Sequence, residues 1–187
     1  MKKWILGLVV LALCAGPSAA SSIGIFASSY SPDDTAGSEG VGVNMEFGSK
    51  VEFQMRWAVY EDLLSDPKPE VYRIEASPLD LGANYNFGSG TTVTPYVGGG
   101  ISYVVFDFDG DVSRTGGQPR AADIDPEFGI YVQFGLDFQL STTWKIWAEL
   151  LYRAVDAEAE SDDLGTPRDQ KVSMSGPALN VGLAVQW

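Results

Sequence analysis

The stretch Phe128-Gly-Ile-Tyr-Val-Gln-Phe-Gly-Leu-Asp-Phe-Gln-Leu140 decides the fold of this chain. Every even-numbered position in it is apolar, whereas the odd-numbered positions hold glycine, tyrosine, glutamine or aspartate. Because side chains alternate between the two faces of a β-strand, the pattern predicts a strand with one apolar face. A helix would need apolar residues both three and four positions apart, which strict alternation cannot provide. The stretch is longer than most half-buried strands and long enough to cross a bilayer at a tilt.

A strand in lipid must belong to a closed barrel, because hydrocarbon offers no partner for unpaired backbone groups. The sequence supplies eight strand patterns in all, at 22–30, 40–48, 50–60, 71–87, 92–106, 127–140, 143–154 and 170–187. Tight turns at 48–50, 88–91 and 141–143 alternate with long connections at 31–39, 61–70, 107–126 and 155–169. Outer-membrane barrels have this asymmetry of short periplasmic turns and long extracellular loops. We predict an all-β, eight-stranded antiparallel up-and-down transmembrane β-barrel with both termini in the periplasm.

The first twenty residues have the layout of a secretory signal peptide. Lys2 and Lys3 precede an apolar run that is too short to cross a membrane as a helix, and Ser18-Ala19-Ala20 supplies the small residues of a cleavage site. Cys14, the only cysteine, lies within this segment, so no thiol chemistry is expected in the exported chain. The sequence therefore predicts a signal peptide at 1–20 and a single barrel domain at 21–187.

The outward face of the predicted strands carries no charged residue. A lysine or arginine facing lipid at mid-bilayer costs about 2–4 kcal/mol, which explains this exclusion. Aromatic residues gather near both ends of the strands, where interfacial girdles are expected; these are Phe47, Trp57, Tyr85, Phe87, Tyr103, Phe138, Trp144, Tyr152 and Trp187. A soluble, lipocalin-like barrel that binds an apolar ligand is an alternative, but it would place these aromatic rings in water.

The inward face is polar and includes both signs of charge. Its charged members are Glu46, Glu52, Arg56, Asp80, Asp137, Lys145, Glu149 and Arg153. Buried charges persist only when they are paired, so we predict that these side chains form an interior polar network that plugs the barrel. A proton or ion path through the same residues is the alternative. Inward Phe26, Tyr96, Tyr131 and Trp147 are expected to fill the remaining space opposite inward glycines.

The fourth strand pattern changes phase near Pro78. In residues 79–87 the odd-numbered positions are apolar and are predicted to face outward. If the same phase continued through residues 71–77, Arg73 and Glu75 would face outward. Proline has no N–H to donate to the hydrogen-bond ladder of a sheet, and within strands it is tolerated at bulges. We therefore predict a β-bulge at Ser77-Pro78. The residues Tyr72, Ile74 and Ala76 would then face outward.

The chain is strongly acidic, with 12 basic and 25 acidic residues and a formal net charge of −13. The predicted strands hold balanced numbers of acids and bases, so the excess of acids falls in the long connections. The bases in those connections are Lys68, Arg114, Arg120 and Arg168. Such a surface repels nucleic acid, and no nucleic-acid partner is expected.

Asp107, Asp109 and Asp111 form the most defined acidic motif, because alternate carboxylates in a loop can converge on a hard cation. The motif lacks the glycine and glutamate of an EF-hand loop. A less specific cluster contains Asp156, Glu158, Glu160, Asp162 and Asp163. We expect weak, multi-site Ca²⁺ or Mg²⁺ binding at these loops, bridging them to anionic lipopolysaccharide, and no other cofactor.

Enzymatic chemistry is not expected. The sequence has no histidine, so the Ser–His and Asp–His arrangements of hydrolases cannot form. Zinc and copper sites lack their usual ligands. Gly98-Gly99-Gly100 lies inside a predicted strand, where it favours a bend and not a phosphate-binding loop.

Three segments resemble small outer-membrane β-barrel proteins of the OmpA-domain, OmpX and OmpW type. The segment 94–103 is similar to their fifth strand, and 147–153 to their seventh strand with its inward Glu and Arg. The segment 179–187 looks like the terminal signal that the barrel assembly machinery reads, with Leu183, Val185 and Trp187 two positions apart. The usual last residue is Phe, which Trp187 replaces. The resemblance implies outer-membrane lipid, lipopolysaccharide and the assembly machinery as partners, without catalytic activity.

The sequence thus predicts a non-catalytic integral outer-membrane barrel with a structural or surface-interaction role through its acidic extracellular loops. It names no extracellular partner. The alternative that the OmpW resemblance implies is a narrow pore or a conduit for small hydrophobic solutes, and the soluble lipocalin-like barrel is a third reading.

Overall fold

The structure, a computed structural model, describes residues 21–33, 37–61, 72–88, 92–110, 126–163 and 166–187. For residues 72–74, 107–110, 157–163 and 166–172 it describes only the backbone. The predicted signal peptide at 1–20 lies outside this range. Within it, no helix is long and apolar enough to cross a membrane.

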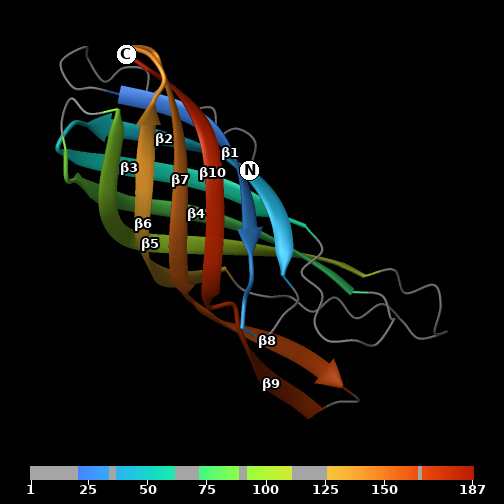
Figure 1. The fold of residues 1–187 in the computed structure, drawn as a ribbon. Helices are drawn as coiled ribbons and strands as arrows, with labels where there is room; N and C mark the ends of the chain where they lie inside the picture. The colour runs from blue at the N-terminus through green and yellow to red at the C-terminus, as the bar shows by residue number, and fades with distance from the viewer. Residues whose placement is uncertain (1–20, 34–36, 62–71, 89–91, 111–125, 164–165) are drawn as a thin grey trace.

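Eight strands close into an antiparallel barrel, and two further strands form a small sheet at one end (Figure 1). The barrel strands are β1 (Ser21–Tyr30), β2 (Ser38–Gly48), β3 (Val51–Tyr60), β4 (Tyr72–Asn86), β5 (Val93–Gly110), β6 (Glu127–Gln139), β7 (Trp144–Ala154) and β10 (Gly176–Gln186). Their order around the barrel is β1-β10-β7-β6-β5-β4-β3-β2. The predicted eight-stranded, up-and-down antiparallel barrel is confirmed.

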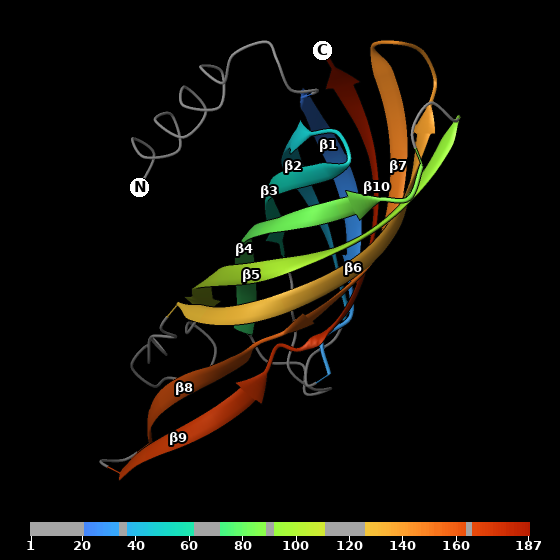
Figure 2. The ribbon, with the colours of Figure 1, turned by 90° about the vertical axis from the view of Figure 1, so that its left-hand side faces the viewer.

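The two ends of the barrel differ. One end holds the start of β1 and the residue after β10. There Ser21 N donates to Trp187 O over 3.2 Å and Trp187 N donates to Ser21 O over 3.0 Å. The same end carries the turns after β2 and β6, and we call it the turn end. The strands β8 (Asp156–Asp163) and β9 (Thr166–Ser173) project from the opposite end, which we call the loop end (Figure 2).

Two tight turns at the turn end follow from their sequences. Gly48 adopts a φ of +123°, which a residue with a side chain rarely tolerates, and it reverses the chain between β2 and β3. In the turn after β6, the Ser141 hydroxyl oxygen accepts hydrogen bonds from the Thr143 and Trp144 backbone N–H groups. The predicted turn at 88–91 falls mostly outside the described residues.

The outer face of the barrel is apolar, as the alternation predicts. Large hydrophobic side chains exposed on it include Ile25, Val41, Phe53, Ile101, Phe128, Ile130, Val132, Phe134, Leu150, Leu179 and Val181. Aromatic rings meet near both ends: Tyr85 and Phe87 pack edge to face at 5.3 Å between centroids, and Tyr103 and Phe128 lie 4.8 Å apart. This arrangement has the apolar band and the aromatic girdles of a barrel surrounded by lipid.

The interior has two chemical layers. The loop-end half holds apolar and aromatic side chains packed together, and we call this the apolar layer: Tyr30, Ala58, Tyr60, Ala76, Val104, Phe106, Leu151, Val155, Met174 and Ala178. The middle and the turn end hold the polar side chains described below. The rings of Tyr30 and Tyr60 lie side by side within the apolar layer, with 5.0 Å between centroids and their planes tilted by 43°.

Inward aromatic rings occupy the space that glycines leave free. A Cβ on Gly182 would collide with the Trp147 indole, and a Cβ on Gly135 would collide with the Tyr96 ring. Phe26 and Trp147 pack against each other at 5.4 Å between centroids. The predicted inward positions of Phe26, Tyr96 and Trp147 are confirmed, and large rings there pack against small residues across the lumen.

The predicted β-bulge at Ser77-Pro78 is wrong. The β4–β5 ladder continues in one register from Asn86 to Tyr72, and β3–β4 pairs Trp57 with Leu79 and Tyr60 with Ala76 in an unchanged register. Ala76, predicted to face outward, is buried in the apolar layer. Pro78 lies between the two β3–β4 pairs, so its missing N–H is accommodated without a shift of phase.

The predicted connection at 155–169 is also wrong, as is the single long strand at 170–187. Residues 156–173 form the β8–β9 hairpin, in which Asp156 pairs with Ser173 and Asp163 with Thr166. The acidic residues 156–163 therefore lie in a strand, and β10 begins only at Gly176. An isolated acidic stretch favours a strand poorly, but pairing with β9 satisfies its backbone groups.

Candidate functional site

The strand register brings the inward polar residues into rows across the barrel wall. Arg56 of β3 is paired with Asp80 of β4, which is in turn paired with Ser102 of β5. On the opposite wall, Glu149 of β7 is paired with Asn180 of β10. Cross-strand partners on one face lie within reach of each other's side chains, so each row forms a continuous polar contact.

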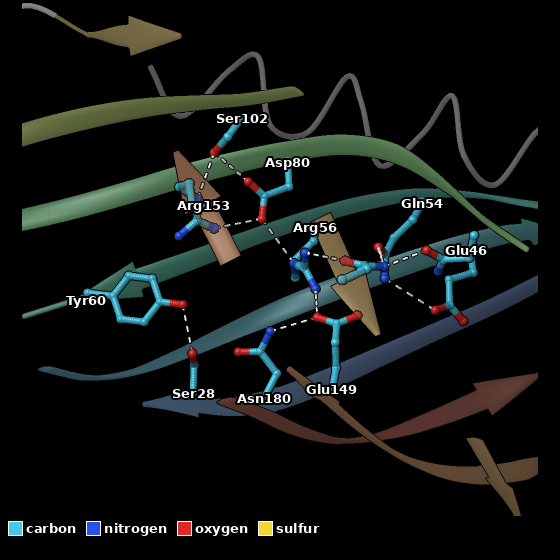
Figure 3. A network of polar contacts seen from close by, with 12 residues as sticks. Ser28, Glu46, Gln54, Arg56, Tyr60, Asp80, Ser102, Glu149, Arg153 and Asn180 are labelled. Atoms are coloured by element: carbon cyan, nitrogen blue, oxygen red, sulfur yellow. Dashed lines mark hydrogen bonds and ion pairs between the residues drawn. The ribbon is translucent and has the colours of Figure 1, made fainter. Parts of the chain in front are cut away.

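Arg56 lies at the centre of the lumen and joins both walls (Figure 3). Its Nε donates to Asp80 Oδ2 over 3.1 Å, and its other guanidinium nitrogens donate to Glu149 Oε1 and to Gln133 Oε1, the latter over 3.0 Å. The guanidinium also lies 5.4 Å from the centroid of the Tyr131 ring. Arg56 is 1% exposed, so its charge is held by protein groups and not by water.

Arg153 provides the second buried cation, nearer the loop end. It donates to Asp80 Oδ2 over 2.9 Å and to Ser102 Oγ over 3.0 Å, while Ser102 donates to Asp80 Oδ1 over 2.6 Å. Its guanidinium lies 5.3 Å from the Tyr30 ring of the apolar layer. Asp80 is thus shared by the two arginines, with a third bond from Ser102.

Glu149 is the second buried anion of this group. It accepts hydrogen bonds from Tyr96 Oη over 3.0 Å and from Asn180 Nδ2 over 2.8 Å, besides the ion pair with Arg56. The residues Arg56, Asp80, Glu149 and Arg153 with their hydrogen-bond partners form what we call the central network. Its two cations and two anions balance, as buried ions must.

Gln133 connects the central network with the turn end. Its Nε2 donates to Gln54 Oε1 over 2.7 Å and to Asn84 Oδ1 over 2.5 Å. Gln54 in turn donates to Glu46 Oε1 over 3.4 Å. The hydrogen bonds therefore continue from mid-barrel to the next group of charges.

The second group of charges, which we call the turn-end cluster, centres on Lys145. Its Nζ donates to Glu46 Oε2 over 2.6 Å and to Asp137 Oδ2 over 2.9 Å. Ser22 Oγ also donates to Glu46 Oε2, over 2.7 Å. Glu52 is less buried and faces this cluster, where its charge interacts with those of Glu46, Lys145 and Asp137.

The two groups together occupy the interior from mid-barrel to the turn end. The side chains of Gln54, Arg56, Asp80, Gln133, Glu149 and Arg153 are all buried, although they face the barrel axis. An eight-stranded barrel leaves just enough interior for its own side chains, and here hydrogen-bonded polar groups occupy it. This geometry supports rigidity and closure, because every central charge is held by at least two partners from different strands.

All eight charged residues predicted to face inward line the barrel interior, and seven of them form ion pairs with one another. Glu52 is the exception, at the edge of the turn-end cluster. The sequence reasoning did not single out Gln133, Ser102 and Asn180, which supply hydrogen bonds to the buried charges. The alternation along each strand could have identified them, because it puts these three positions on the same inward face as the charged residues.

The structure describes the backbone of two of the three aspartates in the predicted cation motif. Asp107 and Asp109 belong to β5, where they are paired with Glu75 and Arg73, so the predicted connection begins later than position 107. Asp111 lies outside the described residues. Among the side chains that the structure describes, no group of three or more His, Cys, Asp or Glu residues could hold a metal ion.

The predicted assembly signal forms the end of β10 and the residue after it. Leu183 is paired with Ile25 on one side and Ile146 on the other, and Val185 with Ile23 and Trp144. Trp187 is exposed at the turn end. These side chains therefore belong to the outer face and leave the interior network untouched.

The OmpW family matches residues 39–186 of this chain. Outer membrane protein W of Vibrio cholerae is 27% identical over 85% of this chain and 87% of its own length. Outer membrane protein W of Salmonella typhi is 31% identical over 48% of this chain, and the match spans 43% of that relative.

Solved structures with this fold include small outer-membrane barrels. The crystal structure of OprG from Pseudomonas aeruginosa superposes with a TM-score of 0.73 at 15% identity, covering 90% of this chain and 96% of OprG. The solution structure of E. coli outer membrane protein W gives a TM-score of 0.58 at 16% identity, covering 91% of this chain and all of that one. At these identities the structural likeness concerns the fold alone.

Proposed function

Because the chain belongs to the OmpW family, we propose that this outer-membrane β-barrel is non-catalytic and non-conducting and acts at its extracellular end. Its role is structural or surface-interacting, through the acidic loops. The observation that carries the proposal is the central network. Four buried ions and their partners cross the lumen at mid-barrel, so a solute would have to break several charge-assisted hydrogen bonds to pass.

The proposed orientation places the turn end in the periplasm and the loop end outside the cell. The short turns and both barrel termini share one end, which is the periplasmic arrangement of bacterial barrels. The partners would be outer-membrane lipid, lipopolysaccharide and the barrel assembly machinery. The excess of acids in the long connections makes a polyanion such as nucleic acid an unsuitable partner.

A conduit for small hydrophobic solutes is the second candidate, and the apolar layer favours it. The loop-end half of the interior is lined by aromatic and aliphatic side chains, which suit an apolar molecule arriving from outside. The central network lies directly below and offers such a molecule no apolar path along the barrel axis. For this reason we place the non-conducting role first.

Planar-bilayer recording tests the proposal. The purified wild-type barrel should give no steady conductance under conditions in which a general porin conducts. The double variant Arg56→Ala/Glu149→Ala removes one cation and one anion together, so the remaining Asp80–Arg153 pair stays balanced. We expect this variant to conduct, because water replaces the deleted side chains. A reproducible wild-type channel would refute the non-conducting role.

The conduit is tested separately by uptake. Cells that express the protein should take up a fluorescent apolar probe no faster than cells that express the double variant Tyr30→Ser/Tyr60→Ser. Both tyrosines belong to the apolar layer, and the serines would make its lining more polar. Faster uptake with the wild-type barrel would favour the conduit over the proposed role.

A further inference from the structure

A pocket of about 950 Å³ opens at the turn end, below the central network. Its walls come from the ends of six strands, β3, β4, β5, β6, β7 and β10, and from the adjoining turns. The charged residues that line it are Lys50, Glu52, Asp137 and Lys145, and Asn86 adds a side-chain amide to a mostly polar wall. The pocket is therefore a built concavity with many hydrogen-bonding groups, and it is separate from the lumen that the central network occupies.

The charges at this pocket do not balance, in contrast to those of the central network. Lys145 is paired with Glu46 and Asp137, so one ammonium group serves two carboxylates. The carboxylate of Glu52 faces the same cluster and forms no ion pair among the described residues. Lys50 lies on the rim, where its ammonium group is 5.5 Å from the Tyr85 ring and exposed to water. The pocket wall itself holds two ammonium groups, of Lys50 and Lys145, and two carboxylates, of Glu52 and Asp137. Glu46, which is paired with Lys145 behind the wall, adds a third carboxylate, so the site as a whole has a net charge of −1.

Two acceptor oxygens at the pocket have no hydrogen-bond donor. The Asn86 side chain is 7% exposed, and its Oδ1 is unpartnered although its Nδ2 donates to Ser49 O over 2.7 Å. The Oδ1 of Asp137 is likewise buried and unpartnered, while its Oδ2 binds Lys145. A buried acceptor without a donor is unfavourable, so a bound molecule that donates N–H groups to these two oxygens would be stabilised by both hydrogen bonds.

We propose that this pocket binds an organic ammonium ion, such as a small aliphatic diamine. The net negative charge favours a cation, and the two unpartnered oxygens favour one that carries several N–H donors. A bare metal ion fits less well, because no group of three or more acidic side chains converges there among the described residues. The inference goes beyond the proposed function, since the pocket lies on the opposite side of the central network from the acidic loops.

Calorimetric titration of the full, purified barrel in zwitterionic detergent tests the site, with 1,4-diaminobutane as the probe. The wild-type protein should bind one equivalent. The variant Glu52→Gln should bind at least about tenfold more weakly, because it loses a charge worth 1.4 kcal/mol or more at this site. The control Glu75→Gln removes one acid from the loop-end half of β4 and should leave the affinity unchanged.

A second variant and a second probe keep the test decisive. Asn86→Asp adds a carboxylate where an amide oxygen lacks a donor, so it should tighten diamine binding. This variant still tests the proposal if Glu52→Gln folds poorly. Folding of each variant is checked by its gel shift on boiling. Equal affinities for the wild type, Glu52→Gln and Asn86→Asp would overturn the proposal. Equal binding of uncharged 1,4-butanediol, or a loss of binding in Glu75→Gln alone, would do so too.

Discussion

Arg56 shows how a single residue ties the barrel together. Its guanidinium reaches side chains on β4, β6 and β7, although the backbone of β3 pairs only with β2 and β4. Such cross-lumen contacts fix the distance between opposite walls, which the backbone ladder alone leaves adjustable. An arginine is suited to this position because its planar group donates in several directions and remains charged when buried.

The variant Arg56→Met should destabilise the folded barrel by about 3–5 kcal/mol, because it leaves Glu149 buried without its ion-pair partner. Urea unfolding in liposomes, followed by tryptophan fluorescence, measures this change. Lys50→Met is the control: Lys50 is exposed at the turn end, so its replacement should change stability by no more than about 0.5 kcal/mol.

The double variant Arg56→Met/Glu149→Met distinguishes a pairing effect from simple loss of packing. Removing both ions should be less destabilising than the sum of the two single changes, because neither charge is then left alone. Additive effects of the two substitutions would mean that their ion pair contributes nothing to stability.

Outside the loop-end half of β4, where Ala76 was assigned to the wrong face, alternation in the sequence predicts which residues face inward but not which of them touch. Alternation fixes the face of each strand, and so it placed Arg56, Asp80 and Glu149 inside. The contact between Arg56 and Glu149 joins β3 to β7 across the lumen, and no local pattern encodes such a pair. The division of charges into a balanced central network and an acidic turn-end cluster also depends on the relative heights of the strands, which the sequence does not give.

The strands β4 and β5 show where reasoning from local sequence failed. The predicted bulge rests on the premise that, without it, Arg73 and Glu75 would face outward into lipid. The structure gives β4 15 residues and β5 18, whereas about 9–11 tilted residues cross a bilayer. The loop-end parts of both strands therefore extend beyond the hydrocarbon region, where an outward charge meets water and no change of phase is needed.

The β8–β9 hairpin is an extension of the barrel wall and not part of its closure. Closure depends on the β7–β10 ladder, which runs from Gly176–Arg153 to Val185–Trp144. Replacing residues 157–172 with Asn-Gly should leave a type I′ turn between Asp156 and Ser173. We expect the shortened barrel to keep its gel shift on boiling and to lose less than about 1 kcal/mol of stability, as a surface change does.

Thermal and urea unfolding of the shortened barrel check this expectation, with the full chain beside it. The design keeps Val155 and Met174, whose side chains belong to the apolar layer and whose backbones are joined by a 3.0 Å hydrogen bond. A shortened chain that no longer folds would show that the hairpin takes part in building the barrel.

At the scale of the whole molecule, the barrel inverts the usual distribution of polarity. Its exposed surface is a belt of apolar side chains, whereas its interior at mid-height contains buried ions. In water this belt would drive aggregation, so the soluble lipocalin-like alternative does not fit the outer face. In a bilayer the same belt is solvated by lipid, and the buried ions lie away from it.

The predicted assembly signal belongs to this scale, because we propose that it directs the barrel to its membrane. Trp187→Ala should lower the amount of folded protein in outer membranes severalfold, as the aromatic end of the signal is lost. The same variant should refold in detergent with nearly wild-type stability, since the Trp187 side chain is exposed and its backbone bonds to Ser21 remain. Cell fractionation and urea unfolding measure the two effects, and Trp187→Phe should behave as wild type in both.

The seam between β1 and β10 sets a condition on the order of events in folding. It pairs Ser22 with Gln186, so the first and the last strand of the barrel meet. Contacts between residues so far apart in the chain form slowly, because the entropy of a very long loop is lost before they are made. An open seam in hydrocarbon would leave a row of backbone groups unbonded. The barrel therefore cannot be completed one strand at a time as the chain emerges, and it must be kept from aggregating until its last residue has arrived.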